Sequence, residues 1–306
     1  MGLEKGVVQG RPPNPTRLND WRQAPLDFTR PAVPARFRSV SCLNAHGAED
    51  ELVVVEVAAS ERVHENARGE VFLRVGDETR RLNPAQVQEL IYDKGQSTFE
   101  ASGVDADPED LDLPLLSAYA DAVNHPEPTR LLQARGLARP DGRLTVGALL
   151  LFGLHPQDRY PEAYVRVLRY RGTQRGTGAR QQLLDDVRCE GPIPHVIERA
   201  RTEIASRLPT RQALGADGRF GPVGIVPEDA WLEGLVNAVI HRSYSAMGDH
   251  IRIEIFDDRI EFESPGRFPG LVDPSNPLAV TRFARNPRIA RVCADLRFGQ
   301  ELGEGI

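Results

Sequence analysis

One block of the sequence, residues 227–266, constrains the fold more than any other. Residues 228–241 repeat apolar side chains with helical period, whereas residues 249–256 alternate apolar and polar side chains as a strand does. Two aspartates then provide a turn, and residues 259–263 alternate again, which predicts an antiparallel hairpin. A helix with one apolar face followed by such a hairpin predicts a helix packed on a sheet.

In the rest of the chain, segments with the apolar period of a helix alternate with segments that have the period of a strand. We therefore expect an α/β (α+β) protein. Residues 51–58 and 70–76 have strand patterns, and residues 83–84 (Asn-Pro) are a favourable helix start. Residues 164–170 predict another strand, and residues 192–208 predict an amphipathic helix. We expect three parts, namely an N-terminal domain over 1–97, a connecting α/β segment over 98–170 and a C-terminal region over 171–306.

Three polar side chains recur every four residues on the polar face of the predicted helix at 228–241. They are Glu233, Asn237 and His241. A carboxylate can act as a base, an amide oxygen can bind a hard metal ion, and an imidazole can donate or accept a proton. This set suits a magnesium-nucleotide site, but it also suits a solvated helix face, and the residues alone leave both interpretations open.

Lysine is almost absent, since only Lys5 and Lys94 are lysines among the 38 basic residues. Neither follows a glycine-rich turn in the P-loop frame, which excludes a P-loop ATPase and a self-contained helicase motor in this chain. Neither position suits a Schiff-base enzyme. The net charge of −6 argues against polyanion binding by the whole surface, so any nucleic-acid contact must be local.

The remaining composition points to an intracellular protein. The three cysteines are scattered without metal spacing, which predicts a reducing compartment and no structural zinc. The longest apolar run, residues 148–152, is too short to cross a bilayer, and residues 1–6 do not resemble a signal peptide. We therefore expect a cytoplasmic protein.

The order of short motifs in the C-terminal half resembles a known family. The stripe Glu233-x-x-x-Asn237-x-x-x-His241 is followed by the hairpin, Asp258-Arg-Ile-Glu-Phe-Glu-Ser-Pro-Gly266, Arg285-Asn-Pro287 and Gly303-Glu-Gly-Ile306. This order resembles the divergent ATP-binding region of bacterial RecG-helicase-related proteins and of Schlafen-type transcriptional regulators with an AlbA-like domain. That region is in turn similar to the GHKL fold of gyrase B, Hsp90, histidine kinases and MutL.

The resemblance implies ATP and Mg²⁺ as cofactors and gives the polar stripe its roles. Glu233 matches the residue that polarises the attacking water, so it is the catalytic candidate. Asn237 matches the magnesium ligand, and His241 matches the polar position one turn later. Whether this chain hydrolyses ATP is left open.

The same resemblance implies that glycine-containing turns contact the nucleotide. Ser264 and Gly266 match the turn that reads the adenine amino group, with serine in place of the aspartate of other GHKL proteins. Gly303 and Gly305 match the second glycine box, whose backbone amides can approach phosphates. Asp258 belongs to the same nucleotide-binding block.

The N-terminal part carries a second resemblance. Residues 1–10 resemble the strand-turn-strand midway through an AlbA-like (Schlafen-box) domain, and residues 63–76 resemble its closing strands. Residues 144–153 resemble the connecting segment of the same proteins. In that family an acidic segment would precede Met1, and further elements would follow Ile306. We therefore expect a chain truncated at both ends, and we assign it no nuclease activity.

An arginine-rich stretch offers a candidate nucleic-acid surface. Arg169, Arg171, Arg175 and Arg180 lie there with tyrosines and a glycine-rich loop, and guanidinium groups can bind backbone phosphates. A solvated arginine-rich face explains the same residues.

The resemblance favours an ATP-binding, DNA-associated regulatory protein, in which Mg-ATP at a GHKL-like site modulates an AlbA-like nucleic-acid-binding domain. Two alternatives stay open: a non-enzymatic nucleic-acid-binding or scaffold protein with a decayed nucleotide site, and a Schlafen-like nuclease whose catalytic segment is missing here. We expect DNA and ATP as partners and no membrane, and self-association is left open.

Overall fold

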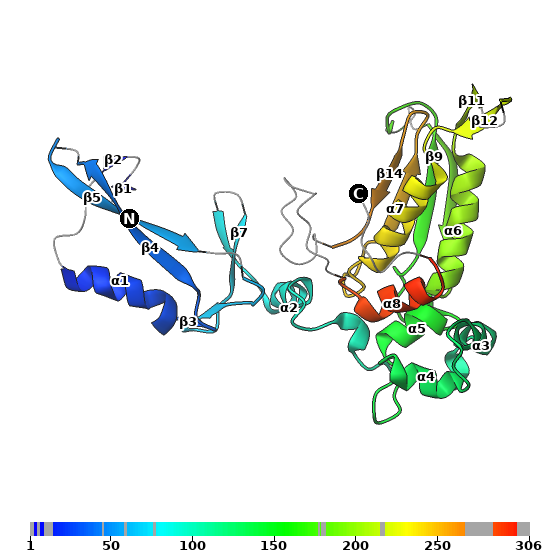
Figure 1. Ribbon diagram of the computed structural model, residues 1–306, viewed down its shortest axis with the longest axis horizontal. Helices are drawn as coiled ribbons and strands as arrows, with labels where there is room; N and C mark the ends of the chain where they lie inside the picture. The colour runs from blue at the N-terminus through cyan, green and yellow to red at the C-terminus, as the bar shows by residue number, and fades with distance from the viewer. Residues whose placement is uncertain are drawn as a thin grey trace. The chain divides into compact units, whose positions relative to one another are not determined.

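Figure 1 shows a computed structural model of the protein, which describes residues 3–4, 7–8, 15–44, 46–57, 60–75, 78–176, 178, 182–214, 218–266 and 284–298. The chain divides into two compact units, Met1–Gln96 (unit 1) and Ser97–Ile306 (unit 2). Helices and strands are mixed along the chain, which confirms the predicted α/β class. The boundary predicted after residue 170 falls inside unit 2.

The described part of unit 1 is built from two-stranded antiparallel sheets and two helices. The longest pair joins β4 (Ala35–Leu43) to β5 (Glu49–Val57), which corresponds to the strand expected at 51–58. The remaining elements are β1 (Leu3–Glu4), β2 (Val7–Val8), α1 (Pro15–Asp27), β3 (Thr29–Arg30), β6 (Glu65–Asn66), β7 (Phe72–Val75), β8 (Glu78–Arg81) and α2 (Pro84–Asp93).

Helix α2 begins as the sequence predicts. The Asn83 side chain accepts a hydrogen bond from the Gln86 amide at 2.9 Å, and the Gln86 side chain accepts one from the Asn83 amide at 3.0 Å. This reciprocal capping box satisfies two amides that the helix itself cannot pair. Pro84 at the first helical position removes a third unpaired donor.

The centre of unit 2 is a four-stranded sheet with the order β10-β9-β13-β14. Its strands are β9 (Val165–Tyr170), β10 (Leu183–Cys189), β13 (Ile251–Ile255) and β14 (Ile260–Glu263). Strands β9 and β13 are parallel, whereas each outer strand is antiparallel to its neighbour. Because β9 pairs with β13, residues on both sides of position 170 belong to one sheet.

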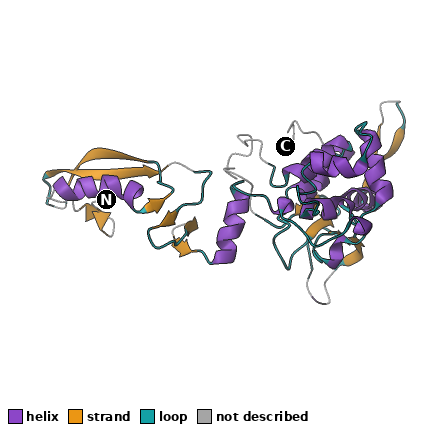
Figure 2. Cartoon of the chain, turned by 90° about the horizontal axis from the view of Figure 1, so that it is seen from below, coloured by secondary structure: helices purple, strands orange, loops and turns teal. Residues whose placement is uncertain are grey.

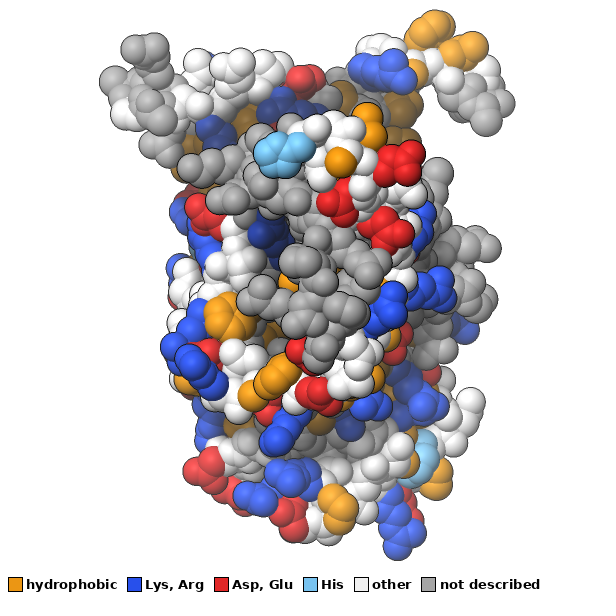
Figure 3. Space-filling model, turned by 90° about the vertical axis from the view of Figure 1, so that its left-hand side faces the viewer, with side chains coloured by type: hydrophobic (Ala, Val, Ile, Leu, Met, Phe, Trp, Pro, Cys, Tyr) orange, Lys and Arg blue, Asp and Glu red, His pale blue; other side chains and the backbone are white. Residues whose placement is uncertain are grey.

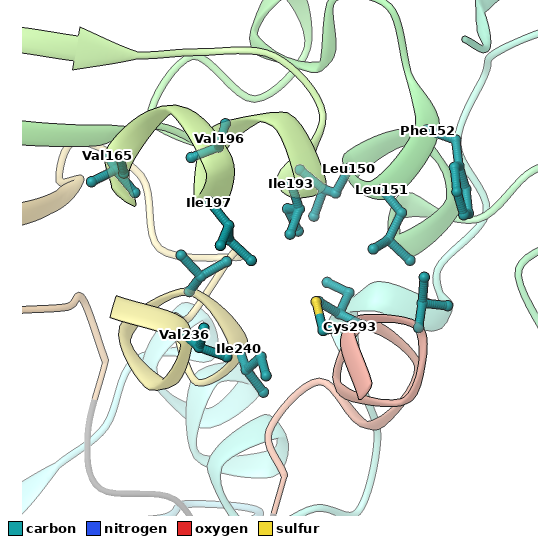
Figure 4. Packing of buried hydrophobic residues seen from close by; sticks show 14 of the residues in the cluster. Leu150, Leu151, Phe152, Val165, Ile193, Val196, Ile197, Val236, Ile240 and Cys293 are labelled. Carbon is teal, nitrogen blue, oxygen red and sulfur yellow. The ribbon is translucent and has the colours of Figure 1, made fainter. Parts of the chain in front are cut away.

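Helices α6 (Ile193–Arg207) and α7 (Glu228–Ile240) cover one face of this sheet (Figure 1). Val167 and Ile253 are fully buried on that face, because alternate residues of a strand point to the same side. Ile197 of α6 and Val236 of α7 belong to the same apolar core, and Figure 4 shows helices α5 to α8 contributing to it.

Helix α7 approaches β14 closely at a glycine. A Cβ atom at Gly234 would lie 3.0 Å from the ring of Phe262, which is tighter than ordinary packing. The absence of a side chain at position 234 therefore lets the helix lie directly on the aromatic ring of the edge strand.

The rest of unit 2 is largely helical, and its helices are purple in Figure 2. It comprises η1 (Phe99–Ala101), η2 (Pro108–Asp110), α3 (Leu113–Ala122), α4 (Pro128–Ala134), α5 (Val146–Phe152), η3 (Pro156–Asp158), α8 (Pro287–Asp295) and the hairpin β11 (Thr210–Leu214) with β12 (Phe220–Gly224). All seven residues of α5 are buried. Among the described helices, none has the length and apolar character needed to cross a membrane.

Candidate functional site

Helix α7 carries the predicted polar stripe on the side away from the core. Trp231, Leu235 and Val239 are buried, whereas Glu233 is exposed and Asn237 is half-buried. His241 follows the last helical residue, and its backbone amide donates to the Asn237 carbonyl at 3.0 Å. The three predicted side chains therefore follow one another along one side of the helix, from the exposed Glu233 to the half-buried Asn237 and His241.

The turn at residues 264–266 lies against the C-terminal half of α7. The Ser264 hydroxyl donates to the Ala238 carbonyl at 2.7 Å. The Ser243 amide donates to the Pro265 carbonyl, also at 2.7 Å. These two hydrogen bonds hold the predicted adenine-reading turn beside the helix that carries Asn237.

Arg285 and Gly266 are in close contact at this turn. Arg285 is only 4% exposed, and a Cβ atom at position 266 would lie 2.5 Å from its Nη1 atom. Gly266 also has φ of 128°, a backbone conformation that side chains disfavour. Glycine is therefore required here both by the backbone and by the neighbouring guanidinium group.

This environment favours the neutral form of His241. Burial lowers the pKa of His241, and the positive charge of Arg285 lowers it further. Its Nδ1 atom is buried and has no hydrogen-bond partner among the residues that the structure describes. A neutral imidazole with an unused nitrogen can bind a polar ligand group by donating or accepting one hydrogen bond.

The polar side chains of α7 offer too few ligands to hold Mg²⁺ without help from another group. Glu233 and Asn237 place two side-chain oxygens on the same side of α7, and Mg²⁺ prefers oxygen ligands. Within the described ranges, no group of three His, Cys, Asp or Glu side chains could hold a metal by itself. Such a sparse set is typical of Mg²⁺ that also binds phosphates and water.

The structure does not bring every predicted nucleotide-binding residue to this place. Asp258 lies in the β13–β14 turn and pairs with Arg259 at 2.9 Å, whereas Ser264 follows the other end of β14. A four-residue strand spans about 13 Å, so Asp258 is too far away to contact the same group as Ser264. Gly303 and Gly305 lie outside the described residues.

The predicted nucleic-acid arginines are partly used within unit 2. Arg169 is 15% exposed, pairs with Asp257 and donates to the Ile255 carbonyl at 3.2 Å. Arg175 pairs with the buried carboxylate of Glu254. Arg171 is exposed, and Arg180 lies outside the described residues. Internal ion pairs therefore explain Arg169 and Arg175 without a phosphate ligand.

Sequence reasoning missed a buried carboxylate that fixes α8. Glu100 is fully buried, and it accepts hydrogen bonds from the backbone amides of Arg288 at 2.7 Å and Ile289 at 2.9 Å. It thereby satisfies two amides at the start of α8 and opposes the positive end of the helix dipole. Burial raises the pKa of Glu100 above its usual range. No local motif around residue 100 signals this role.

The comparisons with known proteins give one family match in the C-terminal part of the chain and one similar solved structure. A family model described as “Putative ATP-dependent DNA helicase recG C-terminal” matches residues 248–306. The DIP2311 protein from Corynebacterium diphtheriae has a similar solved structure, with a TM-score of 0.52 and 20% identity over 98% of this chain. This chain spans 58% of that protein, and at this identity the likeness shows the fold alone. No curated protein matches the sequence.

The family match begins after α7 and includes β13, β14, the turn at 264–266 and α8. It supports a RecG-related, GHKL-like region in the C-terminal part of the chain. Glu233, Asn237 and His241 precede the matched residues, so their roles stay predictions.

Proposed function

We propose that unit 2 binds ATP with Mg²⁺ between the C-terminal half of α7 and the turn at 264–266. The observation that carries this proposal is the pair of hydrogen bonds that holds the glycine turn at 264–266 against the end of α7, the helix that carries Asn237. The match of residues 248–306 to a RecG-type C-terminal family supports the same assignment.

Ser264 is suited to read adenine even though it replaces an aspartate. Its hydroxyl proton is used by the Ala238 carbonyl at 2.7 Å, so the hydroxyl oxygen is left as an acceptor. The exocyclic amino group of adenine is a donor, whereas guanine has a carbonyl oxygen at the equivalent ring position. We therefore expect this turn to prefer ATP over GTP.

Asn237 and Glu233 would lie next to the Mg²⁺ ion that accompanies the nucleotide phosphates. Bound Mg²⁺ would neutralise phosphate charge and orient the phosphate chain. The Asn237 amide oxygen is the half-buried ligand candidate, and the exposed Glu233 carboxylate can accept a proton from a nearby water molecule. Binding alone needs Asn237, whereas hydrolysis would also need Glu233.

We assign DNA association to unit 1, because it resembles AlbA-like domains. Some of its arginines are already paired, as in Arg38–Glu56 at 2.9 Å and Arg81–Glu70 at 3.0 Å. On the face shown in Figure 3, basic and acidic side chains are interspersed. The salt dependence of duplex binding reports how many arginines replace counterions on the DNA. Fluorescence anisotropy with labelled duplex, with and without ATP, measures both the binding and its modulation.

The ATP site is tested by titrating a fluorescent ATP analogue with and without Mg²⁺. We expect Asn237→Ala to weaken Mg²⁺-dependent binding about ten-fold or more, because it removes a charge-assisted ligand contact. Glu233→Gln tests the role of the Glu233 carboxylate in turnover. Its matched control is Glu198→Gln, because Glu198 is an exposed carboxylate on α6. Glu233→Gln should change any ATP turnover, whereas Glu198→Gln should change neither binding nor turnover. Equal affinity of wild type and Asn237→Ala would refute the proposed site.

A further inference from the structure

A cleft in unit 2 lies among η1, α4, the start of α5 and the start of α8. Its volume is about 520 Å³, within the range of small-molecule sites. Its polar lining includes Gln133, Arg139 and Arg288, and its apolar lining includes Ala101, Ala138 and Pro140. None of the residues that line it belongs to the proposed ATP site.

Arg139 presents its charge to this cleft. Its side chain lies over Gly103, since a Cβ atom there would be 3.0 Å from Arg139 Nη1 and 3.3 Å from Cδ. The nearby carboxylate of Asp141 is bound by Arg143, whose Nη2 atom is 2.8 Å from Oδ2. Within the described part of the chain, Arg139 forms no ion pair of its own. Its charge is therefore available to a ligand.

Arg288 approaches the cleft from the first turn of α8. Its Nε atom would be 2.8 Å from a Cβ atom at Gly136, so this side chain too lies directly over a glycine. Its Nη1 atom donates to Thr98 Oγ1 at 3.0 Å and lies 3.7 Å from Glu100 Oε1. Glu100 thus offsets part of the charge of Arg288. The net charge of the cleft stays positive because of Arg139.

Two guanidinium groups that line one cleft can bind an oxyanion, because guanidinium nitrogens donate charge-assisted hydrogen bonds. A phosphate dianion suits this positively charged cleft better than a single carboxylate does, because its three terminal oxygens can accept hydrogen bonds from both guanidinium groups. The alanine and proline side chains offer an apolar surface beside the cations, which suits a compact organic group. We propose that this cleft binds a phosphomonoester of a small organic molecule, through Arg139 and Arg288.

The concave shape favours a small ligand over a nucleic-acid backbone. A duplex is bound by several exposed cations that follow its phosphates, whereas this cleft presents two guanidinium groups within one cavity. Duplex binding through Arg139 is accordingly an outcome that would contradict the proposal.

The test is isothermal titration of the full chain with phenyl phosphate, inorganic phosphate and benzoate. We expect phenyl phosphate to bind most tightly, since it alone offers both the dianion and the apolar ring. Arg139→Gln should weaken it about ten-fold or more, because one charged hydrogen-bond pair is lost. The matched control is Arg130→Gln, an exposed arginine on α4 that pairs with Glu127 outside the cleft. Arg130→Gln should bind as the wild type does.

A second variant tests whether ligand binding depends on the position of the Arg139 side chain as well as on its charge. Gly103→Ala keeps both arginines but places a methyl group 3.0 Å from Arg139 Nη1, so it should also weaken phenyl phosphate binding. Asn237→Ala, which tests the ATP site, should leave phenyl phosphate binding unchanged. The proposal is overturned if Arg139→Gln binds phenyl phosphate normally, if Asn237→Ala abolishes that binding, or if Arg139→Gln loses duplex DNA instead. Circular dichroism and thermal melting confirm that each variant is folded.

Discussion

The buried amide of Asn286 donates a hydrogen bond to the carbonyl of Ile240, the last residue of α7, at 2.7 Å. The same amide donates to the Arg242 carbonyl at 2.9 Å. Asn286 directly precedes α8, so a single side chain joins the end of α7 to the start of α8. Arg285, the preceding residue, contacts Gly266. The geometry of the proposed ATP site therefore depends on this link.

Removing the link should destabilise unit 2. Asn286→Ala leaves two buried carbonyl oxygens without donors, and we expect a loss of about 2 to 4 kcal/mol in the free energy of unfolding. Urea denaturation followed by circular dichroism measures this change. Gln133→Ala, which removes an exposed amide, is the control and should change stability by less than about 0.5 kcal/mol. A similar effect of both substitutions would contradict the structural role of Asn286.

His241 should make stability depend on pH. Its pKa in the folded protein lies below the 6.5 typical of histidine, because burial and Arg285 disfavour the charged ring. As the pH falls below about 6.5, the unfolded chain binds a proton that the folded chain resists, so stability present above that pH is lost. His241→Gln should remove part of this loss. Burial also lowers the pKa of His250, so some acid sensitivity should remain.

The measurement is urea denaturation at pH 7, 6 and 5. Wild type should lose more stability across this interval than His241→Gln does. His195→Gln, which alters an exposed histidine on α6, is the matched control and should follow the wild-type profile. Parallel profiles of wild type and His241→Gln would contradict the assigned burial of this ring.

Gly234 should tolerate no branched side chain. A Cβ atom there would lie 3.0 Å from the Phe262 ring, and the two extra methyl groups of valine would enlarge the overlap. Overpacking of this kind costs about 1 to 3 kcal/mol, and valine recovers little of that through helix propensity. Thermal melting of Gly234→Val should therefore show destabilisation, and adding Phe262→Leu should recover part of it. Independent effects of the two substitutions would argue against the contact.

The elements with strong local patterns could be predicted from the sequence. The spacing of apolar residues predicts the helix at 228–241 and the hairpin at 249–263, because each of these elements buries one face against the other. The start of α2 was equally clear, since Asn83 and Pro84 are a favourable helix start. Local chemistry was sufficient in these cases.

Pairings between distant segments could not be predicted. The parallel pairing of β9 with β13 and the capping of α8 by Glu100 join segments that no local pattern relates. Arg169 and Arg175 illustrate the same limit. Their spacing suggested a phosphate surface, but the carboxylates that pair with them, Asp257 and Glu254, come from another part of the chain. The sequence shows the charges, whereas only the fold shows which of them meet.

Ser264 should set the preference for adenine at the proposed ATP site. Its hydroxyl proton is committed to the Ala238 carbonyl, which leaves the oxygen as an acceptor for an amino group. Ser264→Ala removes that acceptor, so we expect ATP affinity to fall about five- to ten-fold while GTP affinity stays nearly constant. Competition of ATP and GTP against the fluorescent analogue measures the ratio. Ser206→Ala is the control and should leave the ratio unchanged, because that hydroxyl donates to Glu203 and accepts from Arg207 within α6. If Ser264→Ala weakens ATP and GTP equally, the serine supports the turn without reading the base.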